Sequence, residues 1–570
     1  MNRLFTISAA VIVCAALWTA CGKTNPEGGS KLSDNSGKWT ENSDDYISKT
    51  TFDRTVSVVF SSGGATVSGA GSTQTVKTSG NDVTITNNGD EVVRYELSGS
   101  TSDGFFKLYS SRKQALVLKG VSISNPGGAA INNQSKKRTF VVLEGTNTLS
   151  DGSVNSSGKY SDESSSEDMK AAFFSEGQLV FSGSGSLSVT AKGKAGITSD
   201  DYVRLLDGPS INVTSTGGHG VRGKDYVVIS GGTLDINVSA TGKKGISSDT
   251  TVYVGGGVTS ITSSSSAGSV DGELTGAAGI KADVRFEMAG GSLTVNCSGS
   301  GSKGIKCDNV GYIRGGELRV SSTGSNYGSS GRPGSSSSNS KSSKGLKFDG
   351  NLYISGGTVS VSSSSHEGIE TKGVLEISGG SVYSKSSDDA VNSAGDMTIS
   401  AGKVCAWSTG NDGLDANGNL YIKGGTIYAI GSNSPEVAVD ANTEGGKRLY
   451  LSGGTLVALG GLESGSSLSQ SCYSASQTRD SWYALYSGST LALVFKTPST
   501  VGSNGTMVIS TAGTPSLKRG VTTSGGTSLW EGIALEGASV SGGSEVTLSS
   551  YSGGSGGPGG MGGPGGGPGW

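Results

Sequence analysis

Two stretches of the chain follow one frame, GVRGKDYVVISGGTL at residues 220–234 and GLDANGNLYIKGGTI at residues 413–427. Each begins with Gly, an aliphatic residue and a polar residue, passes through a turn into a short β-rich run, and reaches Gly-Gly before a second alternating run. Copies of the frame begin at Gly196, Gly220, Gly245, Gly279, Gly304, Gly345, Gly368, Ala390, Gly413 and Ala438. The centre of the chain is therefore an internal repeat with a period of about 22–25 residues.

Each copy carries three short segments of alternating polarity, which in the copy at Gly345 are Leu346–Phe348, Leu352–Ile354 and Val359–Val361. Strands this short cannot bury a face alone, but stacked copies share one continuous core. Three strands per turn at this period is typical of a parallel β-helix, whereas a propeller blade needs about 40–50 residues. A leucine-rich repeat would need a recurring Leu/Asn frame, which this repeat does not have. We therefore predict an all-β chain, with Gly at the corners because Gly adopts positive φ at little steric cost.

The composition agrees with a repetitive β protein. Gly accounts for 97 of the 570 residues, and the 10 Pro are too few for collagen or polyproline. The net charge of −3 argues against a charge-swollen disordered chain, and no basic excess indicates a nucleic-acid partner. His219 and His366 are the only two histidines, which disfavours a His-cluster metal site or a Ser-His-Asp hydrolase.

The N-terminus is typical of an exported lipoprotein. Residues 1–20 combine Arg3 with an apolar run, Leu4–Leu17, that is too short to span a bilayer comfortably. A small residue, Ala20, stands just after the run and directly before Cys21, as in a lipobox, so we expect cleavage before Cys21 and its lipidation. Ordinary secretion is the alternative. The interpretation places the protein outside the cytoplasm, anchored by lipid at the outer membrane or cell surface, or in the periplasm.

The remaining chain divides into segments that differ in composition and in whether they carry the repeat. We expect a flexible tether, an N-terminal cap with irregular first rungs, the β-helix, a small C-terminal β module and a disordered Gly/Pro tail, at residues 21–50, 51–170, 171–461, 462–552 and 553–570. The cysteines left after residue 21 show no CxxC spacing, so zinc is not indicated. We expect Cys297, Cys307, Cys405 and Cys472 to be small buried hydrophobic residues, although export would permit a disulfide.

Charges of the repeat group into columns, because equivalent positions of successive rungs lie about 4.8 Å apart. The residue before the leading Gly forms one predicted column: His219, Lys244, Ala278, Lys303, Lys344, Glu367, Asp389 and Asp412. The residue two positions after that Gly forms a second, outward-facing column: Arg222, Ser247, Lys281, Lys306, Lys347, Glu370, Asn392, Asp415 and Asp440. Both columns are basic in their first half and acidic in their second half.

Solvated charges on a polar outer face are one interpretation of these columns. The other is a binding site, because stacked carboxylates repel unless a counter-ion intervenes. Calcium takes six to eight oxygens at about 2.3–2.6 Å and is favoured over softer metals here. The predicted calcium ligands are Glu367, Glu370, Asp388, Asp389, Asp412, Asp415 and Asp440. The predicted contacts to carboxylates of a glycan are Arg222, Lys281, Lys306 and Lys347.

Three segments, residues 220–225, 388–392 and 411–422, resemble a family of exported carbohydrate-binding β-helix proteins. That family is described as polysaccharide-lyase-like and binds acidic sugars and cellulose. The resemblance extends over roughly residues 80–550 and implies a right-handed parallel β-helix, similar to pectate lyases, with bound calcium. The acidic column matches the family pattern at Asp388, Asp389, Asp412 and Asp415.

Three functions remain open from the sequence. The first is non-catalytic binding of a polysaccharide, such as the acidic glycan polygalacturonate or a cellulose-like chain, through calcium and the lysine column. The second is a calcium-dependent polysaccharide lyase, which needs a base that no motif identifies; Arg222, Lys372 and Arg448 are candidates. The third is a structural adhesin or spacer. Trp407, Tyr383, Tyr421 and Tyr428 are candidate sugar platforms near the acidic half.

Overall fold

The computed structural model describes residues 41–164, 166–270, 272–328, 340–500 and 506–553. The predicted signal peptide, Cys21 and nearly all of the predicted tail lie outside these residues. Residues 1–50 and 51–570 are separate compact units. The described part of the first holds the 3-10 helices η1 (Ser43–Asp45) and η2 (Ile47–Lys49). In the described part of the second, all elements are strands except the 3-10 helix η3 (Trp530–Gly532).

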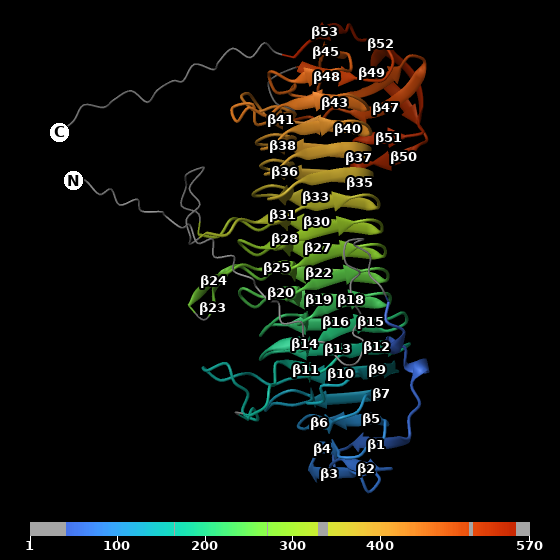
Figure 1. The fold of residues 1–570 in the computed structure, drawn as a ribbon, viewed down its shortest axis with the longest axis vertical. Helices are drawn as coiled ribbons and strands as arrows, with labels where there is room; N and C mark the ends of the chain where they lie inside the picture. The colour runs from blue at the N-terminus through green and yellow to red at the C-terminus, as the bar shows by residue number, and fades with distance from the viewer. Residues whose placement is uncertain (1–40, 165, 271, 329–339, 501–505, 554–570) are drawn as a thin grey trace, which may run out of the picture. The chain divides into compact units, whose positions relative to one another are not determined.

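The second unit is a parallel β-helix whose rungs stack from β4 to β43, as Figure 1 shows. Ladder A is a sheet of 15 strands, parallel apart from its first pair: β3 (Gln74–Ser79), β4 (Asp82–Asn87), β6 (Phe105–Ser110), β8 (Ile131–Asn133), β11 (Ala171–Ser175), β14 (Ala195–Ser199), β17 (Val221–Gly223), β20 (Lys244–Ser248), β25 (Ala278–Ala282), β28 (Lys303–Cys307), β31 (Lys344–Phe348), β34 (Ile369–Thr371), β36 (Val391–Ser393), β38 (Leu414–Ala416) and β41 (Val439–Ala441).

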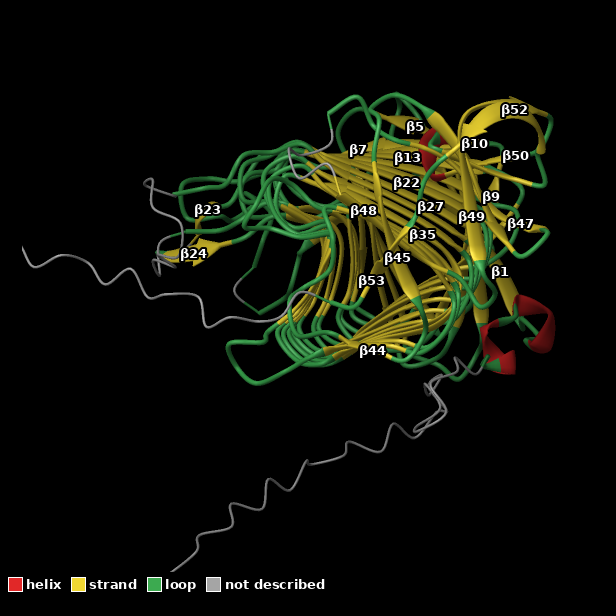
Figure 2. Ribbon diagram, turned by 90° about the horizontal axis from the view of Figure 1, so that it is seen from above, coloured by secondary structure: helices red, strands yellow, loops and turns green. Residues whose placement is uncertain are grey.

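Ladder B is the second parallel face: β9 (Thr139–Glu144), β12 (Leu179–Gly183), β15 (Tyr202–Leu205), β18 (Tyr226–Ile229), β21 (Thr251–Val254), β26 (Arg285–Met288), β29 (Val310–Ile313), β32 (Leu352–Ile354), the first part of β35 (Leu375–Ser386) and of β37 (Met397–Ser408), β39 (Leu420–Ile422), β42 (Leu449–Leu451) and β44 (Ser467–Leu468). Figure 2 looks along the stack and shows the ladders arranged around the core.

Ladder C is the third face: β10 (Thr146–Ser150), β13 (Ser186–Ala191), β16 (Ser210–Ser215), β19 (Thr233–Val238), β22 (Val258–Ser263), β27 (Ser292–Cys297), β30 (Glu317–Ser322), β33 (Thr358–Ser363), the second part of β35 and of β37, β40 (Thr426–Ile430) and β43 (Thr455–Leu459). The first rungs use β1 (Arg54–Phe60), β2 (Thr66–Ser68), β5 (Val93–Thr101) and β7 (Gln114–Ser124). A hairpin, β23 (Gly268–Val270) with β24 (Glu273–Thr275), is inserted before β25.

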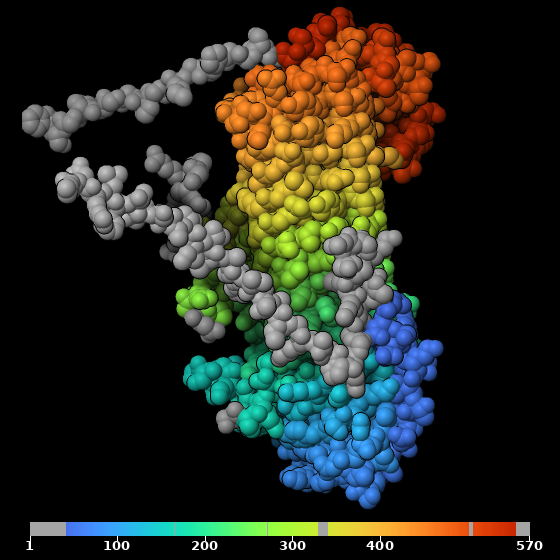
Figure 3. All heavy atoms as spheres, viewed as in Figure 1, coloured from blue at the N-terminus to red at the C-terminus, as the bar shows by residue number. Residues whose placement is uncertain are grey.

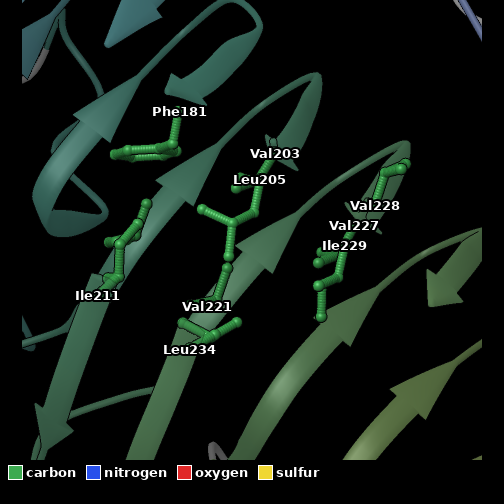
Figure 4. Close-up of a pocket in the computed structure, with 10 residues that line it drawn as sticks. Phe181, Val203, Leu205, Ile211, Val221, Val227, Val228, Ile229 and Leu234 are labelled. Atoms are coloured by element: carbon green, nitrogen blue, oxygen red, sulfur yellow. The ribbon is translucent and has the colours of Figure 1, made fainter. Parts of the chain in front are cut away.

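The core is a stack of aliphatic side chains, as the repeat predicts. The residue after the leading Gly pairs in register from rung to rung, as Ile280, Ile305, Leu346 and Ile369 do, and all four are fully buried. Figure 4 shows an interior space lined by ten residues that include Phe181. Its volume of about 10 Å³ matches a single water, and an apolar space of this kind stays dry. The interior is therefore packing rather than a ligand site.

Two kinds of glycine shape each rung for different reasons. The second Gly of the Gly-Gly pair has positive φ, for example +82° at Gly316, as predicted. The leading Gly does not adopt positive φ, so the expectation for that position was wrong. There a Cβ would collide with the core: at Gly304 it would lie 2.1 Å from Cγ1 of Val320. At Gly304 the glycine is required because the Val320 side chain of β30 lies too close to the backbone of β28 to admit a Cβ.

The C-terminal residues form a β module against the last rungs. β45 (Cys472–Ser476), β48 (Thr506–Ser510) and β53 (Ser549–Tyr551) pair antiparallel at the end of ladder C. A sheet of six strands follows: β50 (Thr527–Leu529), β51 (Ala534–Glu536), β47 (Thr490–Lys496), β46 (Trp482–Ser487), β49 (Pro515–Ser524) and β52 (Ser539–Glu545). Figure 3 shows the orange and red module lying along the side of the last rungs.

The module covers aromatic side chains that the sequence suggested as sugar platforms. Tyr383 and Tyr428 are buried in the hydrophobic cluster between ladder C and the module, and Trp407 packs against that cluster. The Tyr428 hydroxyl donates a hydrogen bond of 2.9 Å to the carbonyl of Lys496. Tyr421 instead stacks on Tyr450 on ladder B, with ring centroids 5.1 Å apart. These four residues therefore form no common surface.

The four cysteines of the described residues are buried free thiols, which confirms their prediction as small hydrophobic residues. Within the same residues, no helix is long and apolar enough to cross a membrane.

The steric role of the leading Gly predicts the effect of a single methyl group. Gly304→Ala should lower the free energy of unfolding by about 1–3 kcal/mol, because the methyl group overpacks the core against Val320. Gly276→Ala is the matched control, because its Cβ would meet no heavy atom closer than 4.0 Å. Urea unfolding followed by circular dichroism measures both changes. Equal midpoints for the two variants would contradict the steric explanation.

Candidate functional site: the charged columns of ladder A

The outward-facing column predicted from the repeat exists in the structure. Its members pair in register across nine consecutive strands: Arg222, Ser247, Lys281, Lys306, Lys347, Glu370, Asn392, Asp415 and Asp440. The column also extends further than predicted. Leu462 bridges Val439, and the Glu463 amide donates to the Val439 carbonyl at 3.0 Å, so Glu463 follows Asp440. Sequence reasoning missed Glu463 because the repeat frame is lost at residue 462.

The column before the leading Gly lies beside the first one. Lys244, Ala278, Lys303 and Lys344 pair in register. The amides of Gly345, Gly368 and Ala390 continue this path by donating to the carbonyls of Glu367, Asp389 and Asp412. At its start, His219 is half-buried, and its Nδ1 accepts a hydrogen bond from the Lys244 amide. Burial and the neighbouring cations lower the pKa of His219 to about 3. This histidine is therefore neutral.

A third column compensates the basic half, and the sequence interpretation overlooked it. Two residues after Ser247, Lys281, Lys306 and Lys347 of the outward-facing column stand Asp249, Asp283, Asp308 and Asp349. Each cation contacts one or two of these carboxylates, as Lys306 does with Asp308, at 2.8 Å, and with Asp349. Arg222, Lys281 and Lys347 are paired in the same way. The four predicted glycan-binding cations therefore already carry counter-charges from their own chain.

Where the columns change from basic to acidic, the charged side chains neutralise one another in a network of ion pairs. Glu370 is only 1% exposed, and its carboxylate contacts Lys344, Lys347 and Lys372. Burial opposes ionisation, but the Lys344 and Lys347 ammonium groups hold the pKa of Glu370 far below its usual value. Glu367 pairs with Lys344 at 2.8 Å. Three of the predicted calcium ligands belong to this network: Glu367, Glu370 and Asp388.

His366 completes that network as a cation. Its Nδ1 lies against Glu367 and 2.9 Å from Asp388. Burial opposes its charge, yet hydrogen bonds to these carboxylates raise the pKa of His366 to about 9. The three side chains are close enough to share a metal ion, but a protonated imidazole is not a ligand. Arg222 and Lys372, considered as lyase bases, are likewise held in ion pairs.

The last rungs hold carboxylates without compensation, which we call the acidic patch: Asp389, Asp412, Asp415, Asp440 and Glu463. No Lys, Arg or His nitrogen of the described residues lies within 4.0 Å of them. The third column here is neutral, with Ala394, Asn417 and Asn442 in place of charged residues. Burial, followed by the neighbouring acidic groups, raises the pKa values of the four aspartates to about 6, 7, 8 and 9 in chain order.

The acidic patch suits a hard cation by its donor set. Asn392 donates to Asp389 at 3.0 Å and to Asp415, while the Val437 amide donates to Asp412 at 2.6 Å. Asp415 also lies against Asp389, and Asp440 against Glu463. Two carboxylates in contact need a proton or a cation between them. The patch offers oxygen donors in such pairs. Among the described residues, three ligand atoms lie close enough to share one ion in His366, Glu367 and Asp388, and in Asp168, Glu176 and Asp200. Lys170 pairs with Asp168 and Asp200 of the second group.

The fold and this face define a parallel β-helix protein with a long, ordered array of charge on one side. Residues 79–390 match the family model of the carbohydrate-binding domain-containing protein family. This match covers more than half of the chain, and the protein belongs to that family.

One similar solved structure is a polysaccharide lyase-like protein from C. thermocellum, a gadolinium derivative. It is 24% identical over 46% of this chain and 100% of that chain, with a TM-score of 0.38. No curated protein matches this chain.

The acidic patch should make stability depend on pH. The raised folded-state pKa values of Asp412 and Asp415 mean that the folded chain binds more protons than the unfolded chain at neutral pH. The free energy of unfolding therefore falls as the pH rises through this range. We expect Asp412→Asn/Asp415→Asn to show a smaller fall between about pH 5 and about pH 8. Urea unfolding in EDTA at several pH values measures the slope, and identical slopes would contradict the expectation.

Proposed function

We propose that this protein binds polysaccharides rich in carboxylate groups, such as polygalacturonate, through calcium ions held at the acidic patch. The membership of a carbohydrate-binding family supports the polysaccharide as partner. The observation that carries the rest is the uncompensated charge of Asp389, Asp412, Asp415, Asp440 and Glu463, on a face where most other charges are paired. A carboxylated ligand alone would be repelled there, so a bridging cation is required.

Calcium suits this role because it accepts six to eight oxygen ligands in flexible geometry. The residues that would hold it are the five carboxylates of the acidic patch together with the Asn392 amide oxygen. Bound calcium supplies positive charge, which removes the repulsion between stacked carboxylates and attracts those of the ligand. The paired network at Glu367, Glu370 and Asp388 would mark the border of this site.

The location of this function follows from the N-terminal pattern. Lipidation at Cys21 would anchor the exported β-helix to a membrane, either at the outer membrane or cell surface or in the periplasm. Cys21→Ser should abolish metabolic incorporation of labelled palmitate and release the protein from the membrane fraction. Unchanged labelling would contradict lipidation at this residue.

Calorimetry tests the calcium-dependent site. The wild-type chain should bind polygalacturonate in calcium, and EDTA should weaken that binding. Asp412→Asn/Asp415→Asn should weaken the calcium-dependent binding at least about tenfold, because two charged ligands are lost. Asp168→Asn/Asp200→Asn is the control, since these two carboxylates lie outside the patch, beside β11 and β14, and are paired with Lys170. Equal binding by all three proteins would contradict the proposal, and release of unsaturated uronate, seen by ultraviolet absorbance, would indicate a lyase instead.

A further inference from the structure

Two lysines of the column before the leading Gly lack the compensation found elsewhere on ladder A. The Lys244 ammonium donates to the carbonyl of Gly242 at 2.8 Å, and that of Lys303 donates to the carbonyl of Ser342 at 2.9 Å. Neither makes an ion pair with a carboxylate within 4.0 Å in the described residues. Lys344, the next member of the column, does pair with Glu367 and Glu370. Lys244 and Lys303 are therefore a distinct pair of ammonium groups with no ion pair in the described residues, although Asp283 and Glu370 lie near enough to act on them.

The surroundings of this pair make its charge unfavourable. Burial, followed by nearby cations such as Lys243 and Lys344, lowers the pKa values of Lys244 and Lys303 to about 8. A buried ammonium group without an ion-pair partner is destabilised. A bound anion would offset both the cost of burial and the repulsion from the neighbouring cations. His219, at the end of the column, is neutral and adds no counter-charge.

Ala278 stands between the two lysines in this column. It pairs in register with both, so their Cα atoms lie two rungs, or about 9.6 Å, apart. It carries a methyl group where both neighbouring rungs carry a lysine, and the flexible lysine stems can bring their ammonium groups toward one another over it. The hairpin β23–β24 immediately precedes Ala278 and packs on the Gly242 loop. Figures 1 and 2 show the hairpin projecting beside ladder A at this level.

We propose that Lys244 and Lys303 form an anion subsite over Ala278 that binds a carboxylate of the polysaccharide directly, without calcium. The inference rests on the proposed function for the identity of the polymer. It adds a second contact, about four rungs from the start of the acidic patch, that recognises the same ligand with the opposite charge. A polymer with regularly spaced carboxylates can engage both, since the β-helix presents its rungs at a regular spacing.

Binding measured in EDTA separates this subsite from the calcium site. The wild-type chain should bind polygalacturonate in EDTA, and Lys244→Gln/Lys303→Gln should bind at least about tenfold more weakly, because charge-assisted hydrogen bonds are lost. Gln retains a donor for the carbonyls of Gly242 and Ser342, so the fold should persist. Lys192→Gln is the control, since Lys192 is an exposed lysine in the corresponding loop of an earlier rung. Fully methyl-esterified polygalacturonate, which has no charge, should not bind in EDTA.

Unchanged binding by the double variant, absence of wild-type binding in EDTA, or equal binding of the esterified polymer would each overturn the subsite. Wild-type binding that is equally strong in calcium and in EDTA would overturn the calcium site and leave the subsite standing. A second measurement needs no variant. Acetic anhydride should label Lys244 and Lys303 readily near pH 8, where their amines are partly deprotonated, and polygalacturonate should protect both. Labelling that the polymer leaves unchanged would count against the subsite.

Discussion

The in-register stacking of parallel strands controls both the core and the charge of this protein. Each rung places its residues about 4.8 Å from their counterparts, so a repeated residue becomes a column. For aliphatic residues the column is a core, as at Ile280, Ile305 and Leu346. For charged residues the same spacing forces like charges together. Every charged column must therefore be neutralised by another column, by a proton or by a bound ion.

The chain uses these solutions in different places along one face. In the basic half, aspartates two residues further along the strand neutralise Lys281 and Lys306. At the change of sign, Glu370 and Lys344 neutralise one another directly. In the acidic patch the compensating column is neutral, so repulsion is left for an ion or a proton to relieve. The two unpaired lysines beside Ala278 are the opposite case. We expect binding on this face at the charged side chains that lack ion-pair partners. The paired charges need no function beyond stabilising the stack.

Much of this arrangement could be predicted from the sequence, because one frame aligns every rung. Counting from the leading Gly was enough to predict the outward-facing column through Asp440. The counting could not predict which charges pair, because the partners of Asp283 and Asp308 depend on how far side chains reach between rungs. Nor could it predict that the module buries Tyr428, because that contact joins segments far apart in the chain. The repeat shows the leading Gly, but not the reason for it. That reason is contact with a side chain two strands later in the chain, as between Gly304 and Val320, and it depends on the folded structure.

The most direct test of this account is anomalous X-ray diffraction from crystals grown in calcium. The account predicts anomalous peaks along the rungs from Asp389 to Glu463, coordinated by the acidic patch. It predicts none along Lys281, Lys306 and Lys347, where the aspartates are already paired. Peaks at the paired carboxylates, or an acidic patch that stays without metal at saturating calcium, would contradict the central claim that uncompensated charge marks the site.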